Sequence, residues 1–330
     1  MDEHEWSLSE WKDLEVRVKR DVDNCSTDYD ARKKIIRHAR NVMRYYTTGF
    51  FIVSRFLPKA KRNDVELIYA AVRYPDEVVD TFNISNDHRL ELITDWRNGY
   101  AAAMQTDSIC AALKKNIPPF VAAFADLVKR HNIPEAYYQS FLDAMQFDIS
   151  PQPFERLDDL INGYIYGSAI VVGYFLTHVY GASSPQAFDD AMESAKNLGI
   201  GLQLTNFLRD VKDDARRGRI YLPMELVRAH GIERFNPEDK QQQEVLKEVV
   251  REMTQLADAY YEKSLRTLSA FHPDSRIAIK ACIDVYRMLN TRIAESNLGI
   301  NHRESVPMME KLKPLPASKF WRVPLAYLRP

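Results

Sequence analysis

Apolar residues recur at intervals of three and four between the prolines, and this spacing constrains the fold more than any other feature of the chain. The stripe from Val245 to Tyr261 is the clearest example, and Asn236 and Pro237 before it suggest a cap and a first helical position. Alternating patterns long enough to predict a strand do not occur in the sequence. The spacing therefore predicts an all-α protein of about ten or more helices.

Glycine usage and the missing motifs argue against the common nucleotide-binding folds. Only 11 of the 330 residues are glycine, and neither GxGxxG nor GxxxxGK[ST] occurs. The chain has no internal repeat and no linker rich in glycine or serine. Its length allows one large domain or two ordinary ones. We expect a single helical domain over residues 1–330.

Charge and cysteine usage exclude several classes of protein. The chain has 45 basic and 46 acidic residues, so nucleic acid is not an expected partner. Cys25, Cys110 and Cys282 are far apart and odd in number, which predicts a reducing compartment rather than a disulfide framework. The acidic opening residues do not resemble a secretory signal. The expected location is cytoplasmic.

One stretch, from Leu160 to Phe188, carries no formal charge. Spans of this length are candidates for membrane crossing. Glycines and polar residues such as Asn162 and His178 dilute it, and the run from Gly181 to Pro185 breaks it. We favour a buried central helix, whose small residues would permit close packing.

Asp76 and Asp80 form the first of two acidic motifs. They are four residues apart, so they project from one face if the helix resumes through Pro75, which a first turn tolerates. Like charges at this spacing destabilise an isolated helix by ~0.2–0.5 kcal/mol per pair, so a cation is expected nearby. Two acidic residues at this spacing are also common on solvated helix faces. Taken by itself, this motif leaves that alternative open.

The second motif is a longer stripe of oxygen-bearing side chains, Gln203, Asn206, Asp210 and Asp214. Oxygen ligands without histidine or cysteine favour Mg²⁺ or Mn²⁺, and Mg²⁺ recruits substrate phosphate oxygens. A basic turn, 216–219, follows the stripe and suits a polyanionic ligand, although it could also be a solvated run of charge. Together the two motifs indicate a diphosphate held through metal ions.

The chain resembles the squalene and phytoene synthase family at two signatures. The second signature is the strongest match and reads Gln-x-x-Asn-x-x-Arg-Asp-x-x-x-Asp-Ala-Arg-Arg-Gly-Arg-x-Tyr-Leu-Pro over residues 203–223. The first is Tyr-x-x-x-Arg-x-x-Asp-Glu-x-x-Asp over residues 69–80, with DExxD in place of the commoner DDxxD. Residues 47–58 and 164–173 are similar to two further helices of the family. The resemblance runs from about residue 40 to 300.

This resemblance implies an isoprenoid-synthase-type helical fold around a central cavity. It also implies head-to-head (1′-1) condensation of two allylic prenyl diphosphates through a cyclopropylcarbinyl diphosphate. The metal ligands implied are Asp76, Asp80, Asn206, Asp210 and Asp214. The substrate-binding residues implied are Thr47, Phe50, Arg73, Gln203, Arg209 and Tyr221. Arg303 and Tyr286 are weaker candidates, because the match fades after about residue 290.

Ionisation of an allylic diphosphate produces a carbocation as well as a diphosphate anion, and the enzyme must stabilise both. The diphosphate that leaves requires metal and guanidinium charge, and the carbocation requires a dry pocket with aromatic faces. Tyr69 and Tyr164 suit that role and join Asp76, Asp80, Asp210 and Asp214 in the expected catalytic set. Packing in the core is the alternative role for both tyrosines.

The product is harder to predict. Burying one more isoprene unit could gain ~4 kcal/mol in a deep pocket, at ~0.8 kcal/mol per CH₂. The DExxD spelling and the small residue Ser54 both favour two geranylgeranyl diphosphates and phytoene. The alternatives are squalene, dehydrosqualene or hydroxysqualene synthesis from two farnesyl diphosphates, and a non-catalytic binding or assembly protein. Because no nicotinamide motif occurs, NADPH is not expected.

The C-terminal segment is basic and aromatic. Residues 307–330 contain five lysines or arginines, with Phe320 and Trp321 between them. Such a segment could rest on an anionic membrane, where each cation contributes ~1 kcal/mol, or it could dock on the domain. We expect peripheral membrane contact. The sequence does not predict an oligomeric state.

Overall fold

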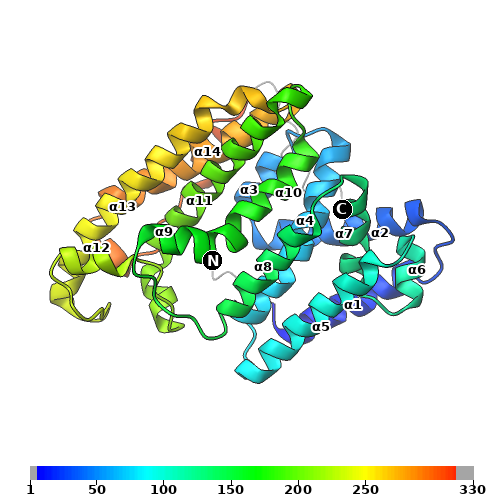
Figure 1. Cartoon of the computed structure of the whole chain (residues 1–330), viewed down its shortest axis with the longest axis horizontal. Helices are drawn as coiled ribbons and strands as arrows, with labels where there is room; N and C mark the ends of the chain where they lie inside the picture. The colour runs from blue at the N-terminus through cyan, green and yellow to red at the C-terminus, as the bar shows by residue number, and fades with distance from the viewer. Residues whose placement is uncertain (1–5, 317–330) are drawn as a thin grey trace. The chain divides into compact units, whose positions relative to one another are not determined.

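A computed structural model describes residues 6–316 of the chain, and its regular elements are helices (Figure 1). Within these residues the only strand-like pairing is one isolated bridge between Ala182 and Phe271. The prediction of an all-α protein is confirmed. The α-helices are α1 Leu8–Val22, α2 Asp28–Tyr46, α3 Thr48–Ser54, α4 Lys59–Asp80, α5 Asn86–Met104, α6 Ile109–Lys114, α7 Pro119–Arg130, α8 Glu135–Phe147, α9 Leu157–Leu160, α10 Val171–Tyr180, α11 Phe188–Arg216, α12 Met224–Ala229, α13 Lys240–Arg266, α14 Pro273–Glu295 and α15 Met308–Leu312.

The chain divides into two compact units. Helices α1 to α8 belong to the first, which runs up to Ile149, and the second begins at Ser150 and holds α9 to α15. The single domain expected from the sequence stays a prediction. Most of the basic segment, including Phe320 and Trp321, lies outside the described residues, whereas Lys311 and Lys313 lie within and just after α15.

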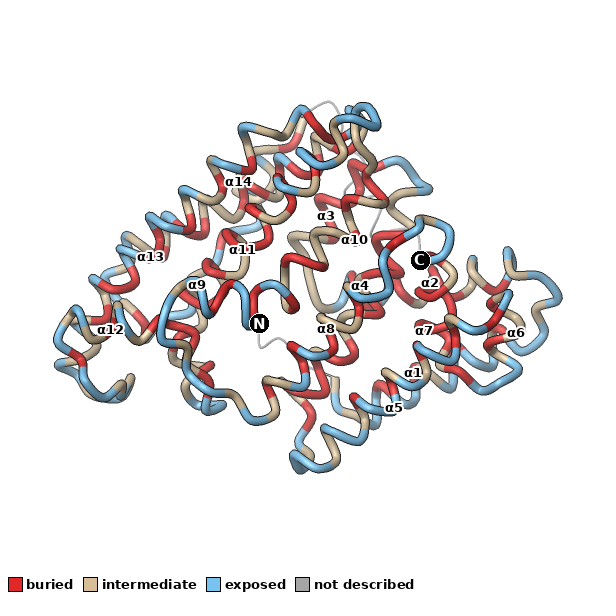
Figure 2. The backbone as a smooth tube through the Cα atoms, viewed as in Figure 1, coloured by how far each residue is buried: buried red, intermediate tan, exposed pale blue. Residues whose placement is uncertain are grey.

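The first unit is built around α4, which packs against α2, α5, α7 and α8. Its core is rich in aromatic rings. Tyr74 of α4 lies 4.3 Å from Trp96 and 5.3 Å from Trp11, measured between ring centroids. Burial follows one face of each surrounding helix, as Figure 2 shows for α1 and α5. These contacts fix the axis of α4, and with it the direction of the acidic residues at its end.

Helix α4 continues through Pro75 without a break, so the expectation that the helix restarts at this proline is wrong. Proline cannot donate the backbone hydrogen bond to the carbonyl four residues earlier, here Ala71. The hydroxyl of Tyr138 on α8 donates to that carbonyl at 2.7 Å instead. Tyr138 in turn accepts a hydrogen bond from the Trp96 indole at 2.8 Å. A tertiary contact thus replaces the missing bond and keeps α4 helical up to Asp80.

The second unit is built around α11, which packs on α13, α14, α10 and the helix before α10. Two glycines permit this close approach. A Cβ atom at Gly199 would lie 3.2 Å from the carbonyl oxygen of Ala169, and one at Gly173 would lie 3.0 Å from that of Ala195. The glycines before the second acidic motif therefore serve the packing of α11.

The uncharged stretch forms a continuous helical run, Leu157–Tyr180, whose middle part, Ile161–Ile170, is a π-helix. By length and composition this run is the one segment of the described chain that could cross a membrane, and half of its apolar stretch is buried inside the protein. Its packing on α11 accounts for its apolar character. The expectation of a buried central helix agrees with these contacts.

Helix α13 begins three residues later than its sequence suggests. Asp239 is the cap, and its side chain accepts hydrogen bonds from the backbone of Gln241 and Gln242. Asn236 instead bonds the backbone of Glu238 at 3.1 Å, a local turn that competes with helix formation. The expected apolar stripe is buried along α13 except at Val245 and Tyr260, which are half-buried, and at Leu256, which is exposed.

Candidate active site

The first acidic motif occupies the last turns of α4. Asp76 and Asp80 lie on one side of the helix and are partly exposed, and Glu77 beside them is buried. The C-terminal end of a helix carries partial negative charge, so acidic side chains there are disfavoured by about 0.3–1 kcal/mol each. No basic residue lies in the last turn of α4. This end of the helix is therefore a place where cations are strongly favoured.

Arg73 is the cation one turn before this motif. Its guanidinium donates to Asp76 at 2.6 Å and to Glu77 at 3.0 Å. It also donates to the Tyr69 hydroxyl at 2.8 Å and lies 4.7 Å above the centre of the Tyr46 ring. Burial raises the pKa of Tyr69 to about 12, so its hydroxyl stays protonated at neutral pH. The structure thus brings Tyr69, Arg73 and Asp76 together, and their roles in the site stay predictions.

Thr47 and Phe50 lie where α2 ends and α3 begins. Thr47 has an extended backbone, and its hydroxyl accepts a hydrogen bond from the backbone of Phe50 at 3.3 Å. The ring of Phe50 lies 6.4 Å from that of Tyr69, so Phe50 lies beside the middle of α4. Ser54 is buried and bonds Phe51 and Arg55. The Arg55 guanidinium packed on Ser54 therefore accounts for the small size of this residue.

The second acidic motif lies along α11. Gln203, Asn206 and Asp210 are partly exposed and Asp214 is buried, at spacings of three and four that place them on one face. Like the first motif, the stripe approaches the C-terminal end of its helix, which is at Arg216. The argument from the helix dipole applies to Asp214 in the last turn, and the carboxylate of Asp210 one turn earlier adds negative charge, so cations are favoured here.

Asp210 is held between two arginines. Arg209 donates to its carboxylate at 2.5 and 2.9 Å, and Arg303 donates at 2.8 Å from beyond the end of α14. Burial alone would raise the pKa of Asp210, but Arg209 and Arg303 outweigh this effect and hold the pKa below its usual value. The position of Arg303 supports its assignment to the site, which the sequence match left weak.

Asn206 has an unusual environment. Its side-chain oxygen is buried and, within the part of the chain that the structure describes, has no hydrogen-bond partner. More than nine in ten buried polar groups are hydrogen-bonded, so an exception needs an explanation. A cation at this position would supply the missing partner.

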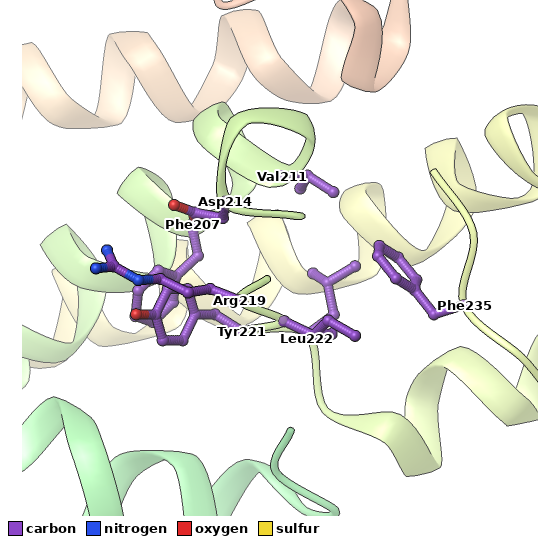
Figure 3. A pocket seen from close by; sticks show the side chains of 8 residues that line it. Phe207, Val211, Asp214, Arg219, Tyr221, Leu222 and Phe235 are labelled. Carbon is purple, nitrogen blue, oxygen red and sulfur yellow. The ribbon is translucent and has the colours of Figure 1, made fainter. Parts of the chain in front are cut away.

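Aromatic rings lie beside this stripe. Tyr221 stacks on Phe207 with centroids 4.2 Å apart and on Tyr164 of the π-helix at 4.8 Å. The Tyr221 hydroxyl donates to that of Tyr164 at 3.2 Å. Figure 3 shows Tyr221 and Phe207 with Asp214 and Arg219 around a cavity of about 10 Å³, the space of about one water molecule. Tyr164 thus lies beside the second motif, and its role at the carbocation stays a prediction.

The oxygen donors of the two motifs fit Mg²⁺ or Mn²⁺. They comprise carboxylates and one orphaned amide oxygen, Asn206 Oδ1. Among residues 6–316 no three carboxylate, imidazole or thiol side chains form a ready-made metal cage. Mg²⁺ does not require one, since it keeps several waters and shares the phosphate oxygens of its substrate. The residues therefore suit a cation that binds together with a diphosphate.

The sequence analysis did not predict two residues that lie beside the acidic motifs. Tyr46 lies under the Arg73 guanidinium, and Phe207 stacks on Tyr221. The sequence could have identified both residues, because Tyr46 directly precedes Thr47 and Phe207 lies within the second motif. Gln203 lies on the expected face of α11. Tyr286 lies within α14.

The chain is similar to known proteins over most of its length. The 15-cis-phytoene synthase of Pantoea ananas is 28% identical over 280 residues, covering 84% of this chain and 89% of that protein. A phytoene synthase of Arthrospira platensis is 29% identical over 290 residues, covering 85% and 91%. The crystal structure of a dehydrosqualene synthase in complex with ligand shares the fold, with 21% identity, a TM-score of 0.74 and coverage of 92% and 99%.

The family match extends over most of the chain. The squalene/phytoene synthase family model matches residues 43–313, which include both acidic motifs and Arg303. Members of this family are head-to-head prenyltransferases of isoprenoid and carotenoid biosynthesis. The chain belongs to the squalene/phytoene synthase family.

Proposed function

We propose that this protein is a phytoene synthase, which joins two geranylgeranyl diphosphates head to head and releases pyrophosphate. The observation that carries the proposal is the pair of acidic helix ends on α4 and α11, each already paired with arginine. The two phytoene synthases, 28 and 29% identical to this chain, support the choice of product. The reaction proceeds through a cyclopropylcarbinyl diphosphate.

Each helix end has the groups that a diphosphate requires. Arg73 at one end, and Arg209 and Arg303 at the other, would turn from their carboxylates to the phosphate oxygens, where charge-assisted hydrogen bonds are strong. A divalent cation held by Asp76 and Asp80, with others held by Asn206, Asp210 and Asp214, would neutralise the leaving diphosphate. Asp76 and Asp210, once released by their arginines, would be the carboxylates that hold the cations. Gln203 would add a neutral donor.

The aromatic residues would protect the carbocation. Tyr164 and Tyr221 are buried and present π faces that carry no full negative charge. Tyr69 and Phe50 would serve the same purpose beside α4, with Thr47 nearby. Exclusion of water keeps the cation from capture as an alcohol.

The substrate is tested by supplying each prenyl diphosphate separately. Purified protein with Mg²⁺ is incubated with geranylgeranyl or farnesyl diphosphate, with and without NADPH, and the hydrocarbon is identified by mass. We expect phytoene from geranylgeranyl diphosphate without NADPH, and loss of turnover in excess EDTA. A product formed only from farnesyl diphosphate would assign the protein to the squalene or dehydrosqualene branch. Full activity in EDTA would contradict the metal assignment.

The adjacent residues Asp214 and Asp213 provide a matched test of the second motif. Asp214→Asn should lower turnover by about 10²–10³, since one electrostatic contact to the developing charge has that effect. Asp213 pairs with Arg216 at 3.3 Å on the exposed side of α11, so Asp213→Asn should stay near wild type. An Asp214→Asn protein that melts earlier but turns over normally would make Asp214 a structural residue.

We also propose that the basic segment contacts an anionic membrane, which would shorten the exit of a water-insoluble product. Within the described residues, Met308 and Met309 are exposed on α15 close to Lys311 and Lys313. Flotation with anionic vesicles at low and high salt checks this. Salt-sensitive binding supports it, and binding that is absent or unaffected by salt contradicts it.

A further inference from the structure

Two of the three cysteines lie close together in the first unit. Cys25 belongs to the turn between α1 and α2, and Cys110 lies in the first turn of α6. The sulfur of Cys110 lies 3.9 Å from the carbonyl oxygen of Cys25, although the residues are 85 positions apart. Both side chains are partly accessible. A disulfide requires neighbouring residues with Cβ atoms about 4 Å apart, and the contact between the Cys110 sulfur and the Cys25 carbonyl makes these two residues neighbours.

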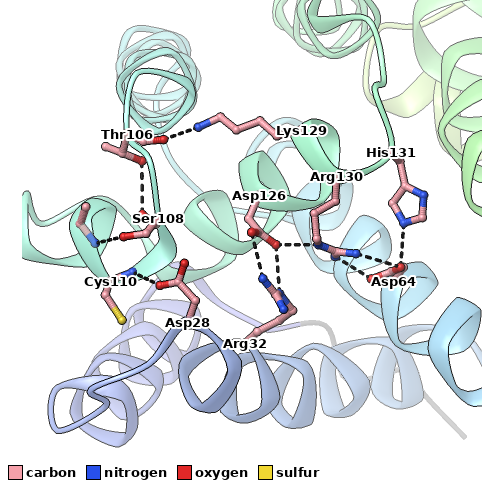
Figure 4. A network of polar contacts seen from close by, with 11 residues as sticks. Asp28, Arg32, Asp64, Thr106, Ser108, Cys110, Asp126, Lys129, Arg130 and His131 are labelled. Atoms are coloured by element: carbon pink, nitrogen blue, oxygen red, sulfur yellow. Dashed lines mark hydrogen bonds and ion pairs between the residues drawn. The ribbon is translucent and has the colours of Figure 1, made fainter.

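The surrounding contacts hold the two cysteines in place. The carboxylate of Asp28, at the start of α2, accepts the backbone N–H of Cys110 at 2.9 Å, as Figure 4 shows. The backbone N–H of Cys25 donates to Val22 at 2.9 Å. Burial, helped by Asp28 and Cys25, raises the pKa of Cys110. Cys110 therefore attacks less readily than an ordinary thiol and suits the second step of an exchange.

Cys25 also borders a basic pocket. The pocket has a volume of about 210 Å³ and is lined by Asn24, Cys25, Ser26, Asp30, Lys33, Lys34 and Arg37. Three cations against one carboxylate favour an anionic ligand. Lys34 is anchored through a hydrogen bond to the backbone of Asp21 at 2.6 Å.

We propose that Cys25 and Cys110 are a redox-active thiol pair, and that the basic pocket binds the anionic disulfide that oxidises them, a molecule of the glutathione disulfide type. The Cys25 thiolate attacks that disulfide, forms a mixed disulfide and releases one small thiolate. Cys110 loses its proton to solvent and attacks the Cys25 sulfur, which releases the second small thiol. The products are a Cys25–Cys110 disulfide and two molecules of reduced thiol, so the two electrons balance.

Mass spectrometry of the full-length protein in glutathione buffers tests the pair without any prenyl substrate. The wild type should lose two hydrogens and give a cross-linked peptide containing Cys25 and Cys110, and Cys282→Ala should behave identically. Cys110→Ser should retain one glutathionyl group on Cys25. Cys25→Ser should remain unmodified at Cys110. A wild type in which Cys25 and Cys110 stay as thiols, or in which modification spreads equally to Cys282, would overturn the proposal.

The anion-binding role of the pocket is tested by comparing a negatively charged oxidant with a neutral one. Lys33→Gln and Arg37→Gln should each slow oxidation by glutathione disulfide about threefold, the effect of one exposed ion pair, and leave the rate with neutral 2-hydroxyethyl disulfide unchanged. Equal slowing with both reagents would remove the anion-binding role. Thermal melts of each variant show that it is folded before the rates are compared.

Discussion

At the scale of single residues, Asn206 departs most from what a folded protein usually tolerates. Its side-chain oxygen is buried without a hydrogen-bond partner in the described chain. Leaving such a group unsatisfied costs about 1–3 kcal/mol. The neighbouring acids carry arginines, as Asp210 does with Arg209 and Arg303, but no cation reaches this amide oxygen. Asn206 is therefore arranged for a ligand rather than for the stability of the folded chain.

Replacing Asn206 with leucine separates these two demands. Asn206→Leu removes the unsatisfied oxygen and keeps a similar volume, so the free energy of unfolding should hold or rise by about 1 kcal/mol. Turnover should fall by about 10²–10³, because a metal ligand is lost. Urea unfolding without metal and steady-state rates at saturating Mg²⁺ measure the two effects.

Asn290 provides the matched control. It is buried in the same unit, and its amide donates to the Thr254 carbonyl at 2.8 Å. Asn290→Leu should lose about 1–3 kcal/mol of stability and leave the turnover of the folded fraction near wild type. If Asn206→Leu instead behaves like this control, Asn206 is a structural residue.

Sequence spacing predicted the residues that share one helix and missed those that meet across helices. Gln203, Asn206, Asp210 and Asp214 follow from the turn of α11 alone. The contact between Arg303 and Asp210 joins positions 93 apart, and no local pattern encodes it. Only the packing of the second unit brings them together.

At the scale of elements, α4 shows how a tertiary contact overrides local propensity. Proline inside a helix costs about 3 kcal/mol or more, partly through the hydrogen bond it removes. Tyr138 supplies that bond to the Ala71 carbonyl. The sequence correctly indicated a helix around Pro75 but not a proline in its interior, because the compensating hydroxyl lies on α8.

This compensation predicts coupling between Pro75 and Tyr138. Tyr138→Phe should destabilise the protein by about 1–2 kcal/mol, because the Ala71 carbonyl and the Trp96 indole both lose a partner. Pro75→Ala restores a backbone donor for Ala71, so the cost of Tyr138→Phe should be smaller in that background. Urea unfolding of the wild type, both single variants and the double variant measures the coupling. Strictly additive costs would show that Tyr138 does not substitute for the missing bond.

The π-helix Ile161–Ile170 could not be predicted from the spacing of hydrophobic residues. Its i→i+5 bonds are rare and produce no distinct hydrophobic pattern over ten residues. The sequence predicted a helix there and Tyr164 within it, and both are confirmed. It could not predict the local widening, which depends on packing against α11.

At the scale of the whole molecule, acidic and basic residues nearly cancel, so pH acts through individual buried groups rather than net charge. In the first unit, Asp64 accepts hydrogen bonds from Arg130 at 2.9 Å and pairs with His131 at 2.8 Å (Figure 4). Burial opposes ionisation of Asp64, but His131 and Arg130 outweigh it and lower its pKa. Glu15 on α1 behaves oppositely, since burial raises its pKa to about 7 against the weaker effects of Trp11 and Lys12.

These opposite shifts predict opposite effects of pH on stability. Between the ordinary pKa of about 4.5 and the folded value of about 7, the folded protein binds the Glu15 proton more tightly than the unfolded chain. The free energy of unfolding therefore falls as pH rises through this window. Glu15→Gln should match the wild type near pH 4.5 and exceed its stability at pH 8 by about 1–2 kcal/mol, after screening by solvent is allowed for.

Asp64→Asn is the control, because its effect on the free energy of unfolding should depend on pH in the opposite direction. An acid whose folded pKa is lowered stabilises the protein above its unfolded pKa of about 3.9, and this stabilisation is lost as pH falls through the folded value. Asp64→Asn should therefore be less stable than the wild type at pH 5, and the difference should close towards pH 3. Urea midpoints of the three proteins at pH 3, 5 and 8 measure both effects. A Glu15→Gln advantage that is the same at pH 5 and pH 8 would show that Glu15 ionises normally, and that burial on α1 does not control this part of the pH profile.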